Sequence, residues 1–273
     1  MDISLIITTY NWPEALTLTL QSVLNQTRLP DELIVADDGS SAGTARIVKD
    51  ALSAYPAKWC HVWHEDRGVR QSRIKNLAVR YSTATYLIFV DQDVVLHPEF
   101  IADHVRMAEK GIFLQGKRVL LSKEHTTEVL EQGSFVPPRF WGRSLGNRKN
   151  AFRFPLLSKM LAKPKAFETS LRGCNLSMFK SDFLAVDGFD ETFDGSWGRE
   201  DSDICYRLFH SGVRVKNLSF LALQYHLRHQ LSEHWDRERL DSELMRNLSE
   251  KRMRALRGFS NLSSEGGVVA SSG

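Results

Sequence analysis

The decapeptide "LIFVDQDVVL", residues 87–96, decides how the rest of the chain is interpreted. Its first four residues are apolar and typical of a buried strand, and Asp91 and Asp93 stand where that strand is expected to end. Carboxylates are rarely buried without a partner, so these two face either a solvated turn or something positive. Because residues two apart in an extended segment point to the same side, both can contact one hard cation, Mg²⁺ or Mn²⁺.

Strands and helices alternate through the first hundred residues. Strands are predicted at 3–10, 32–40, 59–65 and 86–93, with helices from Pro13, at 43–54 and at 68–82. This order predicts an α/β fold with a Rossmann-like, mostly parallel, doubly wound sheet and helices on both faces. Ligands of such sheets bind beyond the carboxyl ends of the strands. The chain places polar and acidic residues there: Thr8, Tyr10, Asn11, Asp37, Asp38, Asp91, Gln92 and Asp93.

The second half of the chain has a less regular pattern. We expect a helix from Pro98, a strand around 111–121, and a strand over 213–226 that ends in histidine. Residues 232–257 predict a strongly charged helix. The tail, 259–273, is low in complexity, which predicts disorder.

Composition excludes some classes of protein. The chain has 273 residues, 42% of them hydrophobic, and a formal net charge of +3, which gives no reason to expect nucleic-acid binding. It shows no signal-peptide pattern and no apolar run of about 18 residues. The three cysteines are far apart, which predicts reduced thiols in a cytoplasmic protein.

Two further clusters carry candidate chemistry. In "GSWGREDSD", residues 195–203, Glu200 and Asp201 follow a glycine-rich turn, where one carboxylate could act as a general base. Acids at the start of a helix are also favoured by its dipole alone. His226 ends a predicted strand and His229 follows; either could complete a metal site with Asp93, or both could be structural.

Positive charge is concentrated in two segments. Residues 139–165 carry eight cations and no acid, interleaved with aromatic residues, which favours an anionic acceptor or a membrane surface over a plain solvated loop. The start of the helix at 68–82 carries cations that either bind phosphate or form a solvated face: Arg67, Arg70, Arg73 and Lys75.

Three motifs, in this order, resemble family 2 glycosyltransferases of the GT-A fold. The opening "LIITTYNWPEALTLTLQSVLNQTRLPDELIVADDGS" is similar to theirs, "FVDQDVVLHPEF" is similar to their D-x-D region, and "GCNLSMFKSDFLAVDGFDETFDGSWGREDSDICYRLFHSG" resembles the galactosyltransferase-type C-terminal motif of chondroitin-polymerase-like enzymes. The resemblance covers roughly residues 3 to 229.

The resemblance implies roles for individual residues. Asp201 would be the catalytic base, with Glu200 holding donor or acceptor hydroxyls; Asp93 would ligate the metal, with Asp91 toward the ribose and metal and His226 as a further ligand, or His229 in its place. The remaining positions would bind the nucleotide sugar: Thr8, Tyr10, Asn11, Asp37, Asp38, Arg73, Asn76, Gln92, Trp197 and Gly198.

The resemblance also implies an activity and a division of the chain. The expected reaction is inverting, metal-dependent transfer of a hexose or N-acetylhexosamine, galactose favoured, from a UDP-sugar to a glycan or lipid-linked glycan. The expected setting is bacterial cell-surface polysaccharide or lipopolysaccharide synthesis in the cytoplasm, with peripheral contact at the inner membrane face. Residues 1–100 would bind the nucleotide sugar, 101–229 the acceptor, and 230–258 would form a helical extension.

Two other functions fit parts of the same pattern. A nucleotidyltransferase also uses carboxylates and a metal, although "TTYNWPE" lacks the glycine-rich phosphate loop typical of that class. A non-catalytic module that holds a nucleotide sugar is the other alternative, and the presence of Asp93, Asp201 and His226 argues against it.

Overall fold

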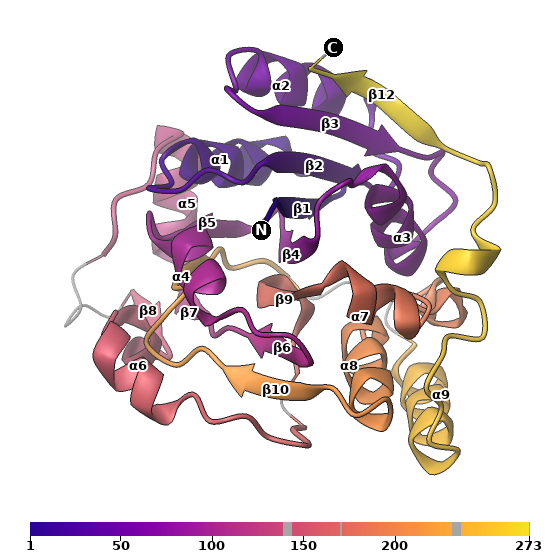
Figure 1. Cartoon of the computed structure of the whole chain (residues 1–273). Coiled ribbons are helices and arrows are strands. Elements are labelled where there is room, and N and C mark those ends of the chain that lie inside the picture. The colour runs from indigo at the N-terminus through magenta and orange to yellow at the C-terminus, as the bar shows by residue number, and fades with distance from the viewer. Residues whose placement is uncertain (139–143, 170, 231–235, 273) are drawn as a thin grey trace.

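An eight-stranded sheet forms the centre of the molecule (Figure 1). The computed structural model describes residues 1–138, 144–169, 171–230 and 236–272. The strands lie in the order β10-β6-β9-β4-β1-β2-β3-β12. The strands β1, β2, β3 and β4 are parallel, as are β6 and β10, whereas β9 and β12 run antiparallel to their neighbours. The predicted doubly wound α/β fold is therefore confirmed, with antiparallel strands inserted in its second half and at one edge.

The first half alternates strand and helix as the sequence predicts. Its elements are β1 (Ile3–Thr9), α1 (Pro13–Leu24), β2 (Glu32–Asp37), α2 (Ala42–Leu52), β3 (Lys58–Trp63), α3 (Gln71–Tyr81) and β4 (Tyr86–Asp91). All seven residues of β1 are buried, as expected of a central strand covered on both faces.

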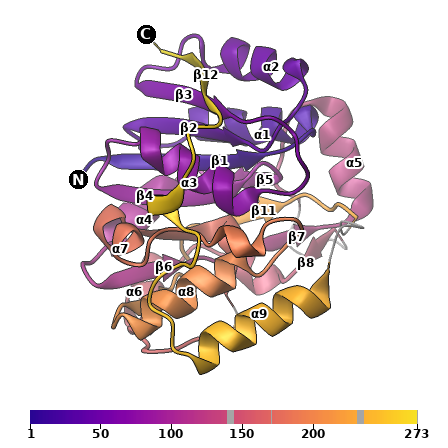
Figure 2. The same ribbon diagram turned by 90° about the vertical axis from the view of Figure 1, so that its right-hand side faces the viewer.

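Helices cover both faces of this sheet (Figures 1 and 2). Along β1, Leu5 and Ile7 pack in one core cluster with side chains of α1, α2 and α4 (Phe100–Met107). Ile6, between them, points to the opposite face and joins a cluster with α3 and with helices of the second half: α7 (Lys180–Ala185), α8 (Glu200–His210) and α9 (Arg237–Ser249). The alternation of apolar side chains along one strand thus holds the two halves of the chain together.

The second half adds strands to the large sheet and builds a small one. The large sheet gains β6 (Ile112–Gln115), β9 (Leu176–Phe179) and β10 (Arg214–Asn217). The small sheet has the order β5-β11-β7-β8, made from β5 (Val94–Leu96), β7 (Val119–Leu121), β8 (Leu145–Gly146) and β11 (Gln224–His226). The remaining helices are α5 (Lys123–Gln132), α6 (Pro155–Leu161) and the short turns η1 (Arg148–Ala151), η2 (Gly173–Asn175) and η3 (Glu191–Phe193).

Two predictions about the end of the chain are wrong. The single strand expected over 213–226 is two strands in two different sheets, because the chain turns between β10 and β11. The tail expected to be disordered forms η4 (Phe259–Asn261) and β12 (Gly267–Ser271), which pairs antiparallel with β3. The backbone of β12 satisfies the open edge of β3, which is the physical reason for its order.

Other predictions stand as follows. The charged C-terminal helix is α9, and all three cysteines are free thiols. Residues 139–143 of the basic segment and 231–235 before α9 lie outside the described residues. The division into functional halves at residues 100 and 229 stays a prediction.

His104 of α4 fixes the strand that joins the two halves of the sheet. Its Nδ1 lies 2.8 Å from the Ser177 hydroxyl in β9, and its Nε2 lies 3.0 Å from Asn175 Oδ1 in η2. The ring is fully buried, and burial lowers its pKa to about 4. The folded protein therefore holds this histidine in its neutral form.

Replacing His104 should remove a pH-dependent loss of stability. In the unfolded chain the imidazole titrates near pH 6.5, so as the pH falls from 6.5 to 4 the unfolded state gains a proton that the folded state does not bind. We expect wild type to lose about 3 kcal/mol of stability to this group across that window. Urea unfolding of wild type and His104→Asn at pH 7.5 and 4.0 measures this loss. The free energy of unfolding of the variant relative to wild type should be higher by that amount at pH 4.0 than at pH 7.5. A difference that stays constant with pH would contradict this role.

Candidate active site

One carboxylate and two imidazoles converge just past the end of β4. Asp93 Oδ2 lies 3.4 Å from His226 Nε2 and 3.1 Å from His229 Nε2. All three ligand atoms lie within 4.8 Å of one another. Strand pairing brings the histidines there: β11 runs antiparallel to β5 with His226 opposite Val94, and the Leu227 N–H donates to the carbonyl of Asp93 at 2.9 Å.

The protonation pattern of this cluster suits a metal ion. Nδ1 of His226 lies 2.8 Å from the Leu227 carbonyl, and Nδ1 of His229 lies 2.7 Å from the Gln230 carbonyl. A carbonyl only accepts, so each Nδ1 is a donor, and Nε2 of each ring is the atom that can give a lone pair to a metal once it carries no proton. Asp93 Oδ1 is buried and has no hydrogen-bond partner among the described residues. These three side chains therefore fit a divalent cation, and two nitrogen ligands favour Mn²⁺ over Mg²⁺.

The two histidines also control the charge of Asp93. Burial alone would raise the pKa of this carboxyl, but His226 and His229 bring it below its ordinary value. Asp93 is therefore ionised at neutral pH, as a metal ligand must be. Asp91 was predicted to share the metal, yet it lies outside this cluster of three.

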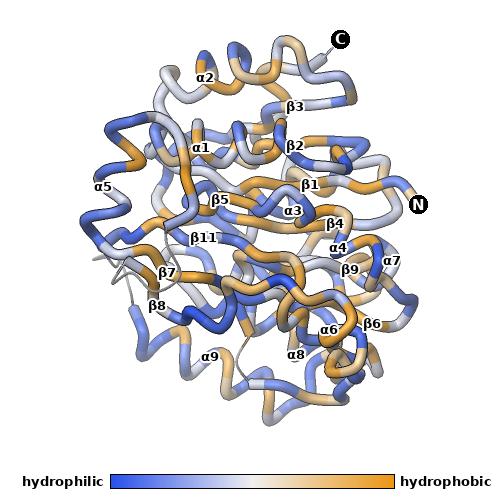
Figure 3. The backbone as a smooth tube through the Cα atoms, turned by 90° about the vertical axis from the view of Figure 1, so that its left-hand side faces the viewer, coloured by the Kyte–Doolittle hydropathy of each residue, from blue (hydrophilic) through white to orange (hydrophobic). Residues whose placement is uncertain are grey.

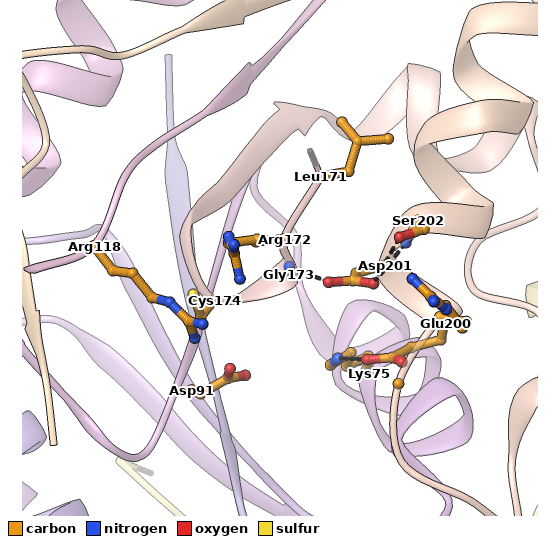
Figure 4. Close-up of a pocket in the computed structure, with 12 residues that line it drawn as sticks. Lys75, Asp91, Arg118, Leu171, Arg172, Gly173, Cys174, Glu200, Asp201 and Ser202 are labelled. Atoms are coloured by element: carbon orange, nitrogen blue, oxygen red, sulfur yellow. Dashed lines mark hydrogen bonds and ion pairs between the residues drawn. The ribbon is translucent and has the colours of Figure 1, made fainter. Parts of the chain in front are cut away.

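Asp91 instead faces a charged cavity of about 220 Å³ at the carboxyl edge of the sheet. The view in Figure 4 shows Asp91 and Arg118 on one side of it and Asp201 and Glu200 on the other, with Lys75 beside Glu200. Four residues predicted for the site line it: Asp91, Gly198, Glu200 and Asp201. Three acidic side chains from distant parts of the sequence thus share one space.

Lys75 is the counter-ion that stabilises these neighbouring carboxylates. Its Nζ donates to Glu200 Oε1 at 2.9 Å, and both side chains are buried. Burial would lower the pKa of Lys75, but Glu200 and then Asp91 raise it above its ordinary value, so the ammonium stays charged. Burial raises the pKa of Asp91 to about 7, and the ammonium of Lys75 opposes that rise.

Asp201 is held by two backbone hydrogen bonds. The Gly173 N–H donates to its Oδ2 and the Ser202 N–H to its Oδ1, both at 2.6 Å. Gly198 and Arg199 just before it have φ of 97° and 75°, a left-handed turn that starts α8 and directs the first residues of the helix into the cavity. Burial, and then the neighbouring Glu200 carboxylate, raise the pKa of Asp201. A fixed, partly desolvated carboxylate of this kind is suited to accept a proton.

The residues predicted for the nucleoside gather at the ends of β1 and β2, but most of them already bond to other residues of the protein. Asp37 is fully buried against His61 at 2.8 Å, and Asp38 accepts from Arg70 N–H at 3.0 Å and contacts His64 at 2.7 Å. The others also have local partners: Tyr10 OH donates to Asp66, Asn11 Oδ1 accepts from Ser41 N–H, and Gln92 bonds with Thr9 and with the backbone of Tyr10. Thr8 Oγ1 is buried without a partner among the described residues. Their role in nucleotide binding stays a prediction.

Three predicted residues are placed differently from expectation. The Arg73 guanidinium turns toward the C-terminal tail and donates to the Glu265 carbonyl at 2.6 Å. The Asn76 side chain hydrogen-bonds to the backbone of Phe189: its Nδ2 donates to the carbonyl at 2.8 Å, and its Oδ1 accepts from the N–H at 2.9 Å. Trp197 is half-buried in the turn before α8 and is not part of the described cavity lining.

Four cations that line the cavity were not predicted for the site: Lys75, Arg118, Arg172 and Arg199. Lys75 was counted only among the charges of its helix, and Arg118 and Arg172 were not singled out. Arg118 links the two parts of the site, because its Nη1 donates to His226 Nε2 at 3.2 Å while its side chain lines the cavity of Asp91 and Asp201. The local sequence around Arg118 and Arg172 does not distinguish them from solvated cations. Lys75 stands directly before Asn76, a residue predicted for the site, and that position was the one sequence signal for it.

Fold and site define a doubly wound α/β protein with a charged ligand cavity, and a cluster that can hold a metal, at the carboxyl edge of its sheet. Comparison with known families gives the class. The description "Glycosyl transferase family 2" matches residues 4–168, and "N-terminal domain of galactosyltransferase" matches residues 157–230. The chain belongs to glycosyl transferase family 2, with a galactosyltransferase-type second half.

Named relatives are similar over most of this chain. It is 30% identical to a validoxylamine A glucosyltransferase of Streptomyces hygroscopicus subsp. limoneus over 77% of its length, and 27% identical to an Escherichia coli chondroitin synthase over 82%. It spans 48% and 34% of those two proteins. A hyaluronan synthase of Pasteurella multocida is 25% identical over 83% of this chain and 24% of its own.

Solved structures show the same fold. TarS of S. aureus superposes with a TM-score of 0.63 at 18% identity, over 92% of this chain and 39% of TarS. The mannosyltransferase PcManGT of Pyrobaculum calidifontis, solved with GDP-Man and Mn²⁺, gives a TM-score of 0.60 at 17% identity, over 92% of this chain and 69% of its own. The GT-A fold expected from the sequence is thereby confirmed.

Divalent metal should stabilise the folded protein through the Asp93 cluster. Since the three ligand atoms converge only in the native state, Mn²⁺ should raise the melting temperature, and more than Mg²⁺ does. We expect a rise of a few degrees at a concentration about 100 times the dissociation constant. In Asp93→Asn and in His226→Ala this rise should be lost, whereas the control His125→Ala, a histidine of α5, should keep it. An equal response in all four proteins would place the metal elsewhere.

Proposed function

We propose that the chain catalyses inverting transfer of a hexose or N-acetylhexosamine, galactose favoured, from a UDP-sugar to a glycan or lipid-linked glycan. Membership of glycosyl transferase family 2 supports the reaction class. TarS, which has the same fold, has been solved with UDP-GlcNAc and with UDP, and this supports a uridine donor. The observation that carries the proposal is the shared cavity of Asp91, Arg118 and Asp201, with Arg118 also contacting a residue of the Asp93 cluster.

The donor would lie between the two halves of the site. Asp93, His226 and His229 would hold the divalent ion, Mn²⁺ in preference to Mg²⁺, which supplies charge neutralisation for the diphosphate leaving group. Arg118 and Arg172 are planar donors suited to phosphate oxygens. Glu200, oriented by Lys75, would accept hydrogen bonds from sugar hydroxyls.

The chemical step needs one base and no covalent intermediate. The acceptor hydroxyl oxygen forms a bond to the anomeric carbon while the bond from that carbon to the diphosphate oxygen breaks. The electron pair leaves with UDP, and the hydroxyl proton passes to Asp201. Asp201 is positioned for this by the Gly173 and Ser202 amides, and attack opposite the leaving group inverts the anomeric centre.

Contact with a membrane surface is proposed for α6. Apolar residues make up most of this helix (Figure 3). Leu156 is 84% exposed and Met160 73% exposed, and Lys159 and Lys163 stand near them in the sequence. Exposed apolar residues mixed with cations are typical of segments that lie on an anionic lipid surface. No helix among the described residues has the length and apolar character needed to span a bilayer. We therefore propose peripheral contact at the cytoplasmic face of a bacterial inner membrane, where a surface polysaccharide or lipopolysaccharide acceptor would be found.

Removing the proposed base should abolish transfer without affecting donor binding. Asp201→Asn keeps one side-chain oxygen for one of the two backbone donors but cannot take a proton, so kcat should fall about 10²–10⁴-fold while the affinity for UDP stays unchanged. UDP release from a panel of UDP-sugars in the presence of Mn²⁺ measures this, with Glu238→Gln, an exposed carboxylate of α9, as control. Wild-type turnover by Asp201→Asn would exclude it as the base, and release of pyrophosphate in place of UDP would indicate a nucleotidyltransferase.

Replacing exposed apolar residues of α6 by glutamate should weaken membrane binding. In Leu156→Glu/Met160→Glu, two apolar side chains are lost and two negative charges face an anionic surface, so the bound fraction on vesicles with one quarter phosphatidylglycerol should fall by about tenfold or more. Cosedimentation measures it. The matched control Met253→Glu/Leu256→Glu changes two similarly exposed apolar residues beyond α9 and should bind as wild type does. Equal losses in both pairs would mean that α6 has no special role.

A further inference from the structure

A second cavity of about 350 Å³ adjoins the one that holds Asp201. Arg118 and Arg172 line both cavities, so the two are adjacent. Lys117 and Lys149 bring a third and a fourth cation to the second cavity, and the described lining contains no acidic residue. The residues that line it all come from positions 116–220, the part of the chain expected to bind the acceptor.

Of these four cations, Lys117 and Arg118 are partly buried, and Lys149 and Arg172 are exposed. Arg153 lies 2.6 Å from Asp103 and 3.2 Å from Glu99, and the buried Arg207 lies 2.7 Å from Asp203. By contrast, none of the cavity cations forms an ion pair with an acidic side chain within the described ranges. Partly desolvated positive charge without a counter-ion, as at Lys117 and Arg118, is unfavourable, so the cavity favours an anion that the chain itself does not supply.

The backbone that carries two of these cations is held rigidly. The Asn175 amide donates to the Lys117 carbonyl at 3.3 Å, and Asn175 packs so close to Gly116 that a Cβ there would lie 2.0 Å from its side chain. Asn150 Nδ2 donates to the Arg118 carbonyl at 2.9 Å. The only side-chain hydrogen bond of Lys117 among the described residues is a long one, 3.4 Å from Nζ to Asn217 Oδ1. The ammonium group thus remains available to a ligand.

The electrostatic surroundings agree with this geometry. Burial lowers the pKa of Lys117, and although Glu168 opposes the shift, the nearby Lys165, Arg172 and Lys149 lower the pKa further. Glu168 is itself paired with Lys165 at 2.9 Å and accepts from Asn217 at 3.0 Å. The acidic group nearest to Lys117 is therefore already neutralised, and the cavity keeps a positive potential.

We propose that this second cavity binds an oxyanion, the carboxylate of a uronic acid or a phosphate ester, carried by the acceptor glycan. The proposal rests on the proposed transferase function and adds the chemical class of the acceptor. The divalent ion and the donor diphosphate are proposed to lie at the Asp93 cluster and in the first cavity, whereas Lys117 and Lys149 line only the second cavity. A hydroxyl placed at Asp201 would therefore belong to a glycan whose next charged group meets Lys117 and Lys149.

The lining also argues against a bilayer headgroup as the ligand. The cavity is concave and offers amide and hydroxyl groups from Asn147, Asn150 and Ser219 beside the cations. Such groups suit a sugar, since each can bond a hydroxyl. Leu161 of α6 is at its edge, which would place the glycan beside the helix proposed to contact the membrane.

Direct binding of short oligosaccharides tests this without requiring turnover. The probes are a tetrasaccharide of alternating glucuronate and N-acetylhexosamine, a glycerol phosphate tetramer, and neutral chitotetraose, each titrated by microscale thermophoresis at low and high salt. We expect at least one of the two anionic probes to bind about tenfold or more tightly than the neutral one, with an advantage that shrinks at high salt. The preferred probe tells a uronate from a phosphate. Equal binding of all three would overturn the proposal.

Two matched variants locate the binding. Lys117→Gln/Lys149→Gln should lower the affinity for the preferred anionic probe about tenfold and leave the neutral probe unchanged. Lys159→Gln/Lys163→Gln removes the same charge from the neighbouring exposed segment and should bind the probe as wild type does. Equal losses in both variants, or loss of binding to anionic vesicles only, would contradict a glycan site in this cavity.

A donor measurement separates this inference from the proposed function. UDP binding in the presence of Mn²⁺ should be unchanged in Lys117→Gln/Lys149→Gln, and a circular dichroism melt checks that the variant is folded. If wild type binds the anionic glycan but not UDP, the proposed transferase function fails and the oxyanion site stands. If it binds UDP but binds anionic and neutral glycans equally, only the oxyanion site is contradicted.

Discussion

The buried ion pair between Lys75 and Glu200 is the interaction on which the site depends. Three carboxylates cannot share a desolvated cavity as anions unless a cation lies among them. That cation is the Lys75 ammonium, 2.9 Å from Glu200. It connects α3, a helix of the N-terminal half, with α8, a helix of the C-terminal half. The same contact therefore fixes how the two halves meet and allows Asp91 and Asp201 to face each other.

Secondary structure fixes the positions of the other groups of the site. The end of β4 carries Asp91, β11 pairs with β5 to bring His226 beside Asp93, and a left-handed turn starts α8 at Glu200. The amides of Gly173 and Ser202 then hold Asp201. The proposed base and a cluster that can hold a metal are thus positioned by backbone contacts, which is the rigidity that the proposed transfer reaction requires.

The sequence predicted what depends on local pattern and failed where distant contacts decide. Apolar runs bounded by helices predicted the parallel strands correctly, and the resemblance singled out Asp93, His226 and His229, which the fold brings together. It did not reveal Lys75, because the inward face of a charged helix is defined only by what packs against it. Arg118 and Arg172 lie outside helices and strands, where no periodicity identifies them. The tail looked disordered because its Gly- and Ser-rich composition hides a short strand that orders only against the edge of β3.

The central claim is that one divalent ion at Asp93 holds a nucleotide donor within reach of Asp201. Anomalous scattering at the manganese edge from crystals grown with UDP and Mn²⁺ tests it most directly. The account predicts a single strong peak bounded by Asp93, His226 and His229, with the diphosphate density extending from it into the cavity lined by Arg118 and Asp201. A manganese peak elsewhere, or UDP density on a face of the molecule remote from Asp201, would contradict it.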